Sequence, residues 1–338
     1  MTDRRRVAIV GAGVAGLTAA RQLAGSFDVT VLDKARGVGG RLATRRIGDA
    51  TVDHGAQFIT THTTEFARTV AGWERAGVAR PWFRGRIGPA GATDADGHLR
   101  YRGVGTMNAI AKHLAEGLDV RLRTRVVALR PAGAAWRLRV DDGSERMADA
   151  VVLTAPVPQA LELLAAGAVR LAGPDEDALR AVRYEPCLAV LAALAGPSGL
   201  APPGAVDPDD GPIDWMADNH LKGVSAVPAV TIHATAAHSR AHWDTPDDAV
   251  AAELLHAAAL ASEPVDGLVQ VQRWRFARPV LVHPDPCLIA GGLPPLVFAG
   301  DAFGGAKVEG AAAAGVAAAA AVGSLLGGPD RPPGSAPR

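Results

Sequence analysis

The sequence predicts an α/β protein with two domains, one of which contains a parallel β-sheet. Three observations support this prediction. The first is an apolar strand, a glycine turn and a helix at the N-terminus, between Val7 and Leu23. The second is a series of period-two strands between residues 120 and 150, typical of an antiparallel meander. The third is an apolar strand, Leu296 to Ala299, followed by an alanine-rich helix.

The N-terminal glycines match the G-x-G-x-x-G pattern of a dinucleotide-binding turn. Gly11 permits a tight turn, Gly13 lets the backbone approach a pyrophosphate, and Gly16 lets the helix pack closely on the strand. The helix that follows directs its unpaired N–H groups and the positive end of its dipole toward the phosphates. Asp33 ends the next strand, 22 positions after Gly11, close to the spacing expected of a carboxylate that binds ribose hydroxyls.

A second glycine turn follows the acidic residue. NAD and FAD both use the first turn, so its glycines leave the choice of dinucleotide open. Gly37, Gly39 and Gly40 would bring further backbone N–H groups to the same pyrophosphate, with Arg36 and Arg41 as phosphate or ribose contacts. The stretch RGVGGR resembles the motif of the FAD-dependent amine oxidase and desaturase superfamily. This resemblance favours FAD.

The composition excludes several other classes of function. The chain has 338 residues, of which 48% are hydrophobic, enough for a large core and two domains. Its 35 basic residues balance 35 acidic ones, so we expect no general attraction to nucleic acid or to a membrane. Cys187 and Cys287 lie 100 positions apart and match neither a metal site nor a C-x-x-C pattern. We therefore expect a cytoplasmic protein without disulfides.

Two segments have the composition of targeting or membrane signals. Residues 1–20 are basic and then apolar, as in a secretory signal, but their glycines belong to the nucleotide turn. Residues 310–326 are about long enough to span a bilayer, but they are alanine and glycine with little leucine. We expect this second segment to be a buried helix packed tightly near the cofactor.

A hairpin is expected between Arg45 and Asp53, with a Gly-Asp turn. The sequence DHGAQFIT follows, and a glycine at position 55 would let the backbone pass close to a flavin ring. Gln57 and Phe58 would then face the substrate, while His54 is either a flavin-site residue or a hydrogen-bonded structural histidine. Trp82, Phe83 and Tyr101, in the section that follows, are predicted to belong to the core or to a pocket wall.

The middle third of the chain is expected to form the substrate domain. A strand between Leu268 and Phe276 places Trp274 and Phe276 on one face with Gln272. These two aromatic residues either face the core or form a wall that stacks a flat substrate ring against the flavin. Asn219 and His220 are weaker candidates, expected on the surface or in a loop.

The sequence contains no recognisable constellation for nucleophilic or metal catalysis. Neither a Ser-His-Asp spacing nor an H-x-x-H pair is present. His238 and His242 are four residues apart and can share a helix face, but no third ligand lies near them in the sequence, so we predict no metal site. An enzyme that mainly positions two rings for hydride transfer would lack such groups.

The C-terminal region is predicted to supply the other end of the flavin site. Gly300 and Asp301 end the strand, and Asp301 is placed to accept hydrogen bonds from the ribityl chain. The N-terminus of the following helix, near Val308 to Gly310, would direct its N–H groups at the flavin and favour the anionic reduced form. Lys307 either assists electron transfer to O2 or is an exposed lysine at a helix start. The proline-rich tail is expected to be disordered.

Six segments, taken in order, resemble the renalase family: GGRLATRR, DHGAQFIT, LTAPVPQ, DWMADNHLKG, QRWRFARP and GDAFGGAKVEGAAAAG. The resemblance covers both ends and the middle of the chain. It implies non-covalent FAD and the oxidation of mis-reduced 2- or 6-dihydro isomers of NAD(P)H to NAD(P)⁺, with O2 reduced to H2O2. The partners would then be this nicotinamide dinucleotide and O2. A resemblance to other two-dinucleotide-fold flavoproteins places Val126 beside the adenine.

The predicted architecture is a Rossmann-type FAD-binding domain with a parallel sheet and a β-meander, and a mixed-sheet substrate domain like those of p-hydroxybenzoate hydroxylase and amine oxidases. The FAD-binding domain comprises residues 1–60, 103–160 and 286–328, the substrate domain 61–102 and 161–285, and the tail 329–338. Two alternatives remain, namely a flavin amine oxidase or desaturase, and a flavin-binding protein without catalytic activity. The predicted catalytic residues are Gln57, Trp274, Phe276 and Lys307, and the predicted cofactor-binding residues are Gly11, Gly13, Ala15, Gly16, Asp33, Lys34, Arg36, Gly40, Arg41, His54, Gly55, Ala56, Gln57, Val126, Thr154, Pro156, Gly300, Asp301, Val308, Glu309 and Gly310.

Overall fold

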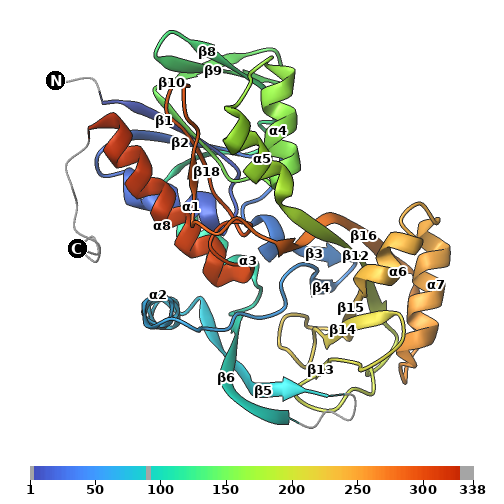
Figure 1. Cartoon of the computed structure of the whole chain (residues 1–338). Helices are drawn as coiled ribbons and strands as arrows, with labels where there is room; N and C mark the ends of the chain where they lie inside the picture. Colours follow the sequence, from blue (N-terminus) through green and yellow to red (C-terminus); the bar gives the residue numbers. More distant parts are fainter. Residues whose placement is uncertain (1–3, 89–92, 328–338) are drawn as a thin grey trace. The chain divides into compact units, whose positions relative to one another are not determined.

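The computed structural model describes residues 4–88 and 93–327, which divide into two compact units (Figure 1). Unit 1 is assembled from residues 1–40, 114–183 and 279–338, and unit 2 from residues 41–113 and 184–278. The predicted disordered tail, 329–338, lies outside the described residues.

Unit 1 is built on a six-stranded sheet with the order β17-β18-β11-β1-β2-β7. Five of its strands are parallel, and β17 pairs antiparallel with β18 at one edge. The central strands are apolar on both faces, as expected of a parallel sheet that is covered on both sides. The strands are β1 (Arg6–Val10), β2 (Asp28–Leu32), β7 (Asp119–Arg121), β11 (Ala150–Leu153), β17 (Leu288–Ile289) and β18 (Leu296–Phe298).

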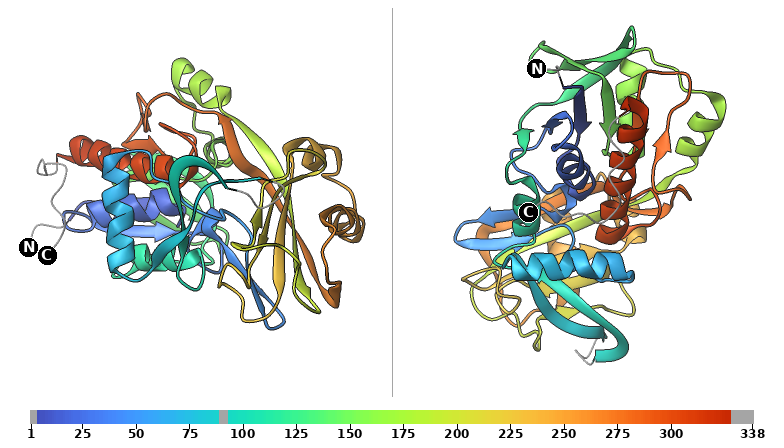
Figure 2. Two further views of the ribbon diagram at one scale, coloured as in Figure 1. Left: turned by 90° about the horizontal axis from the view of Figure 1, so that it is seen from below. Right: turned by 90° about the vertical axis from the view of Figure 1, so that its left-hand side faces the viewer.

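Two helices of unit 1 pack unusually closely. The helix α1 (Val14–Leu23) lies alongside α8 (Lys307–Leu326) (Figures 1 and 2). A Cβ atom added to Gly315 would lie only 2.4 Å from the carbonyl oxygen of Ala15. By length and composition α8 is apolar enough to cross a membrane, but its alanine and glycine face is buried against α1, which explains this composition.

The predicted meander is present as a three-stranded antiparallel sheet in the order β10-β9-β8. Gly143 has a φ of +85° in the turn between β9 and β10, a conformation that favours glycine. Trp136 of β9 is fully buried, and its Nε1 donates to the carbonyl oxygens of Pro294 and Pro295. The elements are β8 (Val126–Ala132), β9 (Ala135–Val140), β10 (Glu145–Ala148) and the helices α4 (Val157–Ala166) and α5 (Gly173–Ala181) that follow β11.

Unit 2 contains a five-stranded sheet with the order β13-β14-β15-β12-β16. Alternate residues of β12 contribute to two hydrophobic clusters: Leu188 and Val190 pack with α7, and Ala189 and Leu191 pack with the hairpin β3–β4. Both faces of the sheet are therefore covered. The elements are β12 (Arg183–Leu194), β13 (Ala205–Val206), β14 (Ile213–Asp218), β15 (Ala229–Ala234), β16 (Pro264–Leu281), α6 (Ala236–Ala241) and α7 (Asp247–Ala258).

The unit boundaries differ from the predicted domain boundaries in four places: residues 41–60 and 103–113 belong to unit 2, and residues 161–183 and 279–285 belong to unit 1. Residues 41–60 belong to unit 2, because the hairpin packs its apolar residues against the five-stranded sheet. Residues 161–183 belong to unit 1, because α4 packs on β8. The remaining elements are η1 (Gly40–Leu42), β3 (Thr44–Ile47), β4 (Ala50–Asp53), α2 (Thr64–Arg75), β5 (Ala79–Ile87), β6 (Thr93–Gly103) and α3 (Asn108–Ala115).

The close packing of α8 on α1 can be tested with two glycines of the same helix. Gly315→Ala should lower the free energy of unfolding by about 1–3 kcal/mol, because the new methyl group meets the backbone of α1. Gly323→Ala, whose Cβ would meet no described atom within 4 Å, should instead raise it by about 0.5–1 kcal/mol through helix propensity. Urea denaturation measures both changes. Equal effects of the two substitutions would contradict this packing.

Candidate functional site

In the first glycine turn of unit 1, the packing requires glycine at two positions, and space is left beside the third. A Cβ on Gly16 would lie 2.0 Å from the carbonyl oxygen of Gly11, and Gly11 itself has a φ of +116°. Gly13, directly before α1, faces no described atom within 4 Å of an added Cβ. Gly11 and Gly16 therefore close the turn, while Gly13 leaves room for a ligand at the positive end of α1.

Asp33 is bound to the backbone of this turn. Its Oδ2 accepts a hydrogen bond of 2.6 Å from the N–H of Ala12, and its Oδ1 accepts one of 2.7 Å from the N–H of Ala35. A carboxylate has about four acceptor positions, so these two bonds leave capacity for a ribose hydroxyl. Asp33 thus also fixes the geometry of the glycine turn, a role that its spacing alone does not indicate.

The second glycine turn contacts the first. The N–H of Gly39 donates to the carbonyl oxygen of Ala12 at 2.8 Å, and a Cβ on Gly40 would lie 3.4 Å from Cα of Gly13. Of the predicted contacts beside it, Arg36 is exposed, and Lys34 is exposed and donates to Gln159 at 3.3 Å. The two turns therefore form one cradle of backbone groups within unit 1.

Four further predicted cofactor-binding residues also belong to unit 1. The hydroxyl of Thr154 donates to the carbonyl oxygens of Val10 and Gly11 at 3.0 and 3.2 Å, so it fixes the end of β1. Gly300, with a φ of +132°, faces the carbonyl oxygen of Thr154. Pro156 is the N-cap of α4, and Val126 is buried at the start of β8.

The N-terminus of α8 is tightly constrained. A Cβ on Gly310 would lie 1.7 Å from the carbonyl oxygen of Gly305, so the preceding loop lies directly against the first turn of the helix. Lys307 is exposed and has a φ of +75°, an uncommon conformation for a residue other than glycine. Asp301, Val308 and Glu309 are half-buried around this end of the helix.

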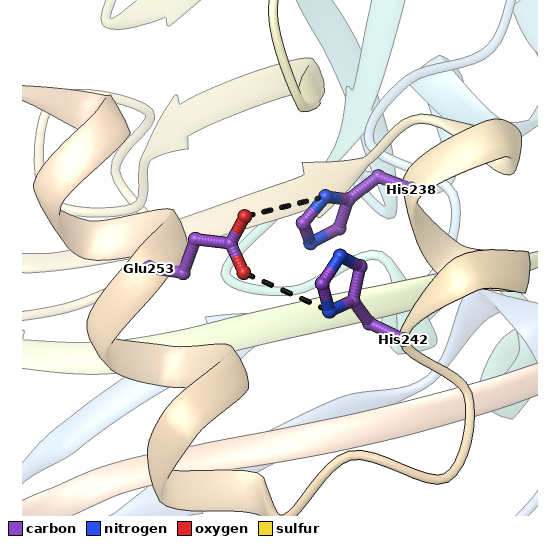
Figure 3. Close-up of side chains that lie close together, drawn as sticks. All are labelled: His238, His242 and Glu253. Carbon is purple, nitrogen blue, oxygen red and sulfur yellow. Dashed lines mark ion pairs between the residues drawn. The ribbon is translucent and has the colours of Figure 1, made fainter.

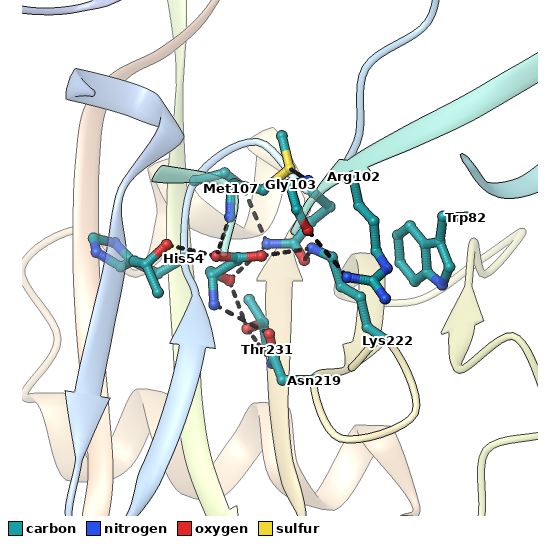
Figure 4. Close-up of polar contacts among 12 residues, drawn as sticks. His54, Trp82, Arg102, Gly103, Met107, Asn219, Lys222 and Thr231 are labelled. Carbon is teal, nitrogen blue, oxygen red and sulfur yellow. Dashed lines mark hydrogen bonds and ion pairs between the residues drawn. The ribbon is translucent and has the colours of Figure 1, made fainter. Parts of the chain in front are cut away.

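A buried ion pair lies at the centre of unit 2 (Figure 4). The Nζ of Lys222 is 3.0 Å from Oδ2 of Asp53, and both side chains are 0% exposed. The Oδ1 of Asp53 accepts hydrogen bonds from the Thr44 hydroxyl at 2.6 Å and the Met107 N–H at 3.0 Å. Burial lowers the pKa of Lys222, and the Asp53 carboxylate opposes this shift.

Gln57 and Asn219 belong to the same polar network. The Gln57 amide accepts from Lys222 at 3.1 Å and donates to the carbonyl oxygens of Asp53 and Gly55. Its polar atoms are thus bonded inside the protein, whereas the sequence predicted contact with a substrate. Asn219 was expected in a loop or on the surface; it lies in the turn directly after β14, but it is not on the surface. Its side chain is 0% exposed, accepts from the Asp53 N–H at 3.1 Å and donates to Thr231 at 2.9 Å.

His54 is held against Trp274. Their rings stack with centroids 5.4 Å apart, and Nε1 of Trp274 donates to the carbonyl oxygen of His54 at 2.9 Å. The pKa of His54 is lowered to about 4, mainly by burial and also by the charges of Arg45 and His233, while Asp53 opposes this shift. Burial also lowers the pKa of His233 to about 4. Both imidazoles are therefore neutral at neutral pH.

Arg41 and the β16 aromatic residues form a second group within unit 2. The guanidinium of Arg41 donates to the carbonyl oxygens of Phe276 and Ala277 at 3.2 and 3.4 Å. A Cβ on Gly55 would lie 2.0 Å from the carbonyl oxygen of Arg41, which also accepts from the Ala56 N–H. Position 55 must therefore be glycine, because any side chain there would collide with the backbone of Arg41. The Phe276 ring contacts Tyr184, whereas Trp274 packs against the cluster formed by the hairpin and the sheet.

Four half-buried aromatic residues, Phe58, Trp82, Phe83 and Trp215, form what we call the aromatic cluster. Their ring centroids are 4.9 to 6.5 Å apart in each contacting pair, and Lys222 lies 4.9 Å from the Trp82 ring centroid. The buried Nε1 of Trp215 has no hydrogen-bond partner in the described part of the chain. The sequence indicated three of these residues as pocket wall or substrate contacts but missed Trp215, because its neighbours come from distant segments.

Comparison with known proteins shows which family the chain belongs to. Residues 9–71 match the NAD(P)-binding Rossmann-like domain, and residues 77–323 match the flavin-containing amine oxidoreductase family. The chain belongs to this family. The chain is also similar to renalase of Mus musculus, with 25% identity over 189 residues. That match covers 53% of this chain and 55% of renalase, so the chain spans about half the length of this curated relative.

Solved structures show the same fold. A candidate protoporphyrinogen oxidase from Exiguobacterium sp. 255-15 has a TM-score of 0.70 and 14% identity, and a double mutant of putrescine oxidase has a TM-score of 0.69 and 16% identity. Each comparison covers 96% of this chain and 99% of the other. The predicted fold class, with its Rossmann-like sheet and mixed sheet, is confirmed.

The cofactor of this oxidoreductase is FAD, and the residues of unit 1 fit it. Gly13 leaves room at the N-terminus of α1, the second glycine turn adds backbone N–H groups, and Asp33 retains acceptor capacity. The family also implies a small-molecule substrate. In unit 2, the polar network and the aromatic cluster are the candidate groups around that substrate.

The imidazoles of His54 and His233 predict how stability depends on pH. Their folded pKa values of about 4 lie below the ordinary 6.5, so between these values the unfolded chain binds protons that the folded chain does not. Stability should therefore be fully present above pH 6.5 and fall as the pH decreases to about 4, by at most about 3 kcal/mol for His54. In urea denaturation across this range, His233→Gln should show a shallower fall than the wild type or the exposed-site control His256→Gln. Parallel curves would contradict the assignment.

The buried ion pair can be tested by removing its cation. Lys222→Met leaves the Asp53 carboxylate buried without its counter-charge and should cost about 3–5 kcal/mol of folding free energy. The double substitution Asp53→Asn with Lys222→Met should recover part of this loss, and Lys112→Met, at an exposed lysine, should have little effect. If Lys222→Met is as mild as Lys112→Met in urea denaturation, the pair does not stabilise unit 2.

Proposed function

We propose that this protein is a renalase-like FAD-dependent oxidase that converts mis-reduced 2- or 6-dihydro isomers of NAD(P)H to NAD(P)⁺. The similarity to mouse renalase and the six renalase-like segments support this substrate class. When bound, non-covalent FAD supplies the hydride acceptor at N5 and passes the electrons to O2, which forms H2O2. The protein then has to bind the two dinucleotides, orient the substrate ring and exclude water.

The aromatic cluster is the observation that carries this proposal. A dihydropyridine is flat and loses hydride without needing a nucleophile, so it needs an apolar surface on which it can stack. Phe83 and Trp215 offer nearly parallel rings, with an angle of 18° between their planes. The unpartnered Nε1 of Trp215 is a suitable donor to the carboxamide oxygen of a nicotinamide.

The polar network supports this cluster from inside unit 2. Lys222 contacts the Trp82 ring and is held by Asp53 and Gln57, so it places a fixed positive charge beside the rings. In this proposal Gln57 is a positioning residue, since it acts through Lys222. Trp274 and Phe276 remain proposed wall residues, and Lys307 remains the proposed cation that assists O2 reduction.

The two cysteines have no role in the proposed reaction. Cys187 and Cys287 are both free thiols in the described structure. Burial raises the pKa of Cys187 to about 12, so this thiol is protonated and unreactive at neutral pH.

A cytoplasmic location is proposed from the absence of cysteine pairs with disulfide-like spacing in the sequence.

The main alternative is a flavin amine oxidase or desaturase, which the family match itself favours. A third possibility is a flavin-binding protein without turnover. Anaerobic reduction distinguishes the three. We expect the yellow protein to bleach with a 2- or 6-dihydro isomer of NAD(P)H and not with putrescine or benzylamine. Bleaching by an amine alone would establish the alternative, and a flavin that no reductant bleaches would support the non-catalytic role.

The role of Trp215 gives a sharper test in the same assay. Trp215→Phe keeps a ring in the cluster but removes the N–H, and should weaken substrate binding roughly threefold to tenfold. Trp243→Phe, at an indole under Arg275 and outside the cluster, is the matched control. Equal dissociation constants for the two variants would remove Trp215 from the proposed substrate site.

A further inference from the structure

Three side chains that can bind a metal ion meet at one end of unit 2 (Figure 3). His238 lies on α6, His242 is the residue that ends this helix, and Glu253 lies on α7. The two Nδ1 atoms are 3.7 and 3.8 Å from the carboxylate oxygens of Glu253. The sequence predicted no third ligand near the histidine pair, and this is corrected by the structure. Glu253 was missed because a loop and a second helix bring it there.

The histidine pair is fixed by its backbone. Thr235 caps α6 by accepting from the His238 N–H, and the Ser239 hydroxyl accepts from the Leu188 N–H of β12 at 2.9 Å. The His242 N–H donates to the His238 carbonyl oxygen at 3.0 Å, which keeps one helical turn between the two histidines. Their rings consequently stack with centroids 4.2 Å apart and an angle of 19°.

The connection to α7 is fixed as well. Arg273 of β16 donates to the carbonyl oxygens of Trp243 and Thr245 and to the Asp247 carboxylate. On α7, Val250 and Leu254 are fully buried in the core of unit 2. Glu253 therefore lies on the outer face of a helix whose position is determined by the core and by Arg273.

The geometry is unlike that of an ordinary ion pair. Separations of 3.7 and 3.8 Å are too long for hydrogen bonds, and two stacked imidazoles disfavour the protonation of both rings. The Nε2 of His238 is buried and has no hydrogen-bond partner within the described ranges of the chain. Ligand atoms around a tetrahedral zinc ion lie about 3.3 Å apart, from bond lengths near 2.0 Å, so a small closure of this cluster would accommodate one ion.

We propose that His238, His242 and Glu253 form a binding site for one divalent transition-metal ion that joins α6 to α7. The three ligand atoms lie within 4.8 Å of one another. His238 is 8% exposed, whereas His242 and Glu253 are 35% and 47% exposed, so the ion enters from solvent and a water molecule completes its coordination. Two imidazoles and one carboxylate select zinc, nickel or copper over magnesium and calcium.

Calorimetric titration of the metal-free, flavin-loaded full chain with Zn²⁺, without a polyhistidine tag, tests this site. We expect one ion per chain and a rise in the melting temperature with zinc concentration. His242→Gln and Glu253→Gln should each weaken zinc binding by at least about tenfold. Both side chains are partly exposed, so the variants should fold, and their melting temperatures without metal verify this.

His256→Gln on α7 is the matched control, since it removes an exposed histidine outside the cluster and should leave zinc binding unchanged. Substitution with Co²⁺ should give the intense visible absorption of a tetrahedral site, and this signal should be lost in Glu253→Gln. Absence of zinc binding, equal affinity in all three variants, or equally strong binding of Mg²⁺ would each overturn the proposal. None of these readouts depends on the activity of the flavin.

Discussion

The buried pair Asp53–Lys222 is the interaction on which much of unit 2 depends. Both side chains are completely removed from solvent, and burial of two charges is costly unless each is fully bonded. In addition to the ion pair itself, the surrounding chain supplies hydrogen-bond partners from four segments: Thr44, Gln57, Met107 and, through the Asp53 backbone, Asn219. The pair therefore ties the hairpin, the segment before α3 and the β14–β15 connection to one point. The aromatic cluster lies beside it.

Close backbone contact is the corresponding constraint in unit 1. Glycines 11 and 16 close the nucleotide turn, glycine 40 brings the second turn against it, and glycine 315 lets α8 approach α1. Each position lies where a side chain would meet a backbone or hydroxyl oxygen, or in a conformation that other residues disfavour. The boundary between the units falls directly after Gly40, so the renalase-like segment GGRLATRR contributes its glycines to one unit and its arginines to the other.

Local patterns predicted the elements well because they are properties of neighbouring residues. The strand, turn and helix at the N-terminus, the meander and the α8 helix all follow from periodicity and from glycine spacing. Burial could not be read in the same way. Asn219 lies in a polar segment, and only its partners on β4 and β15 make it a buried residue. Trp274 and Phe276 share a strand face, as alternation requires, but their ring partners differ because different segments cross that face.

The sequence by itself determined the α/β class, the dinucleotide turn, FAD as the cofactor and the resemblance to renalase, because these depend on short motifs in order along the chain. The tertiary structure alone decided which polar groups became charged partners in the core and which aromatic residues gathered into a cluster. It also brought Glu253 to His238 and His242, which sequence spacing had left as an isolated pair. Such groupings depend on contacts between distant segments, and no local pattern records the partner that lies across the fold.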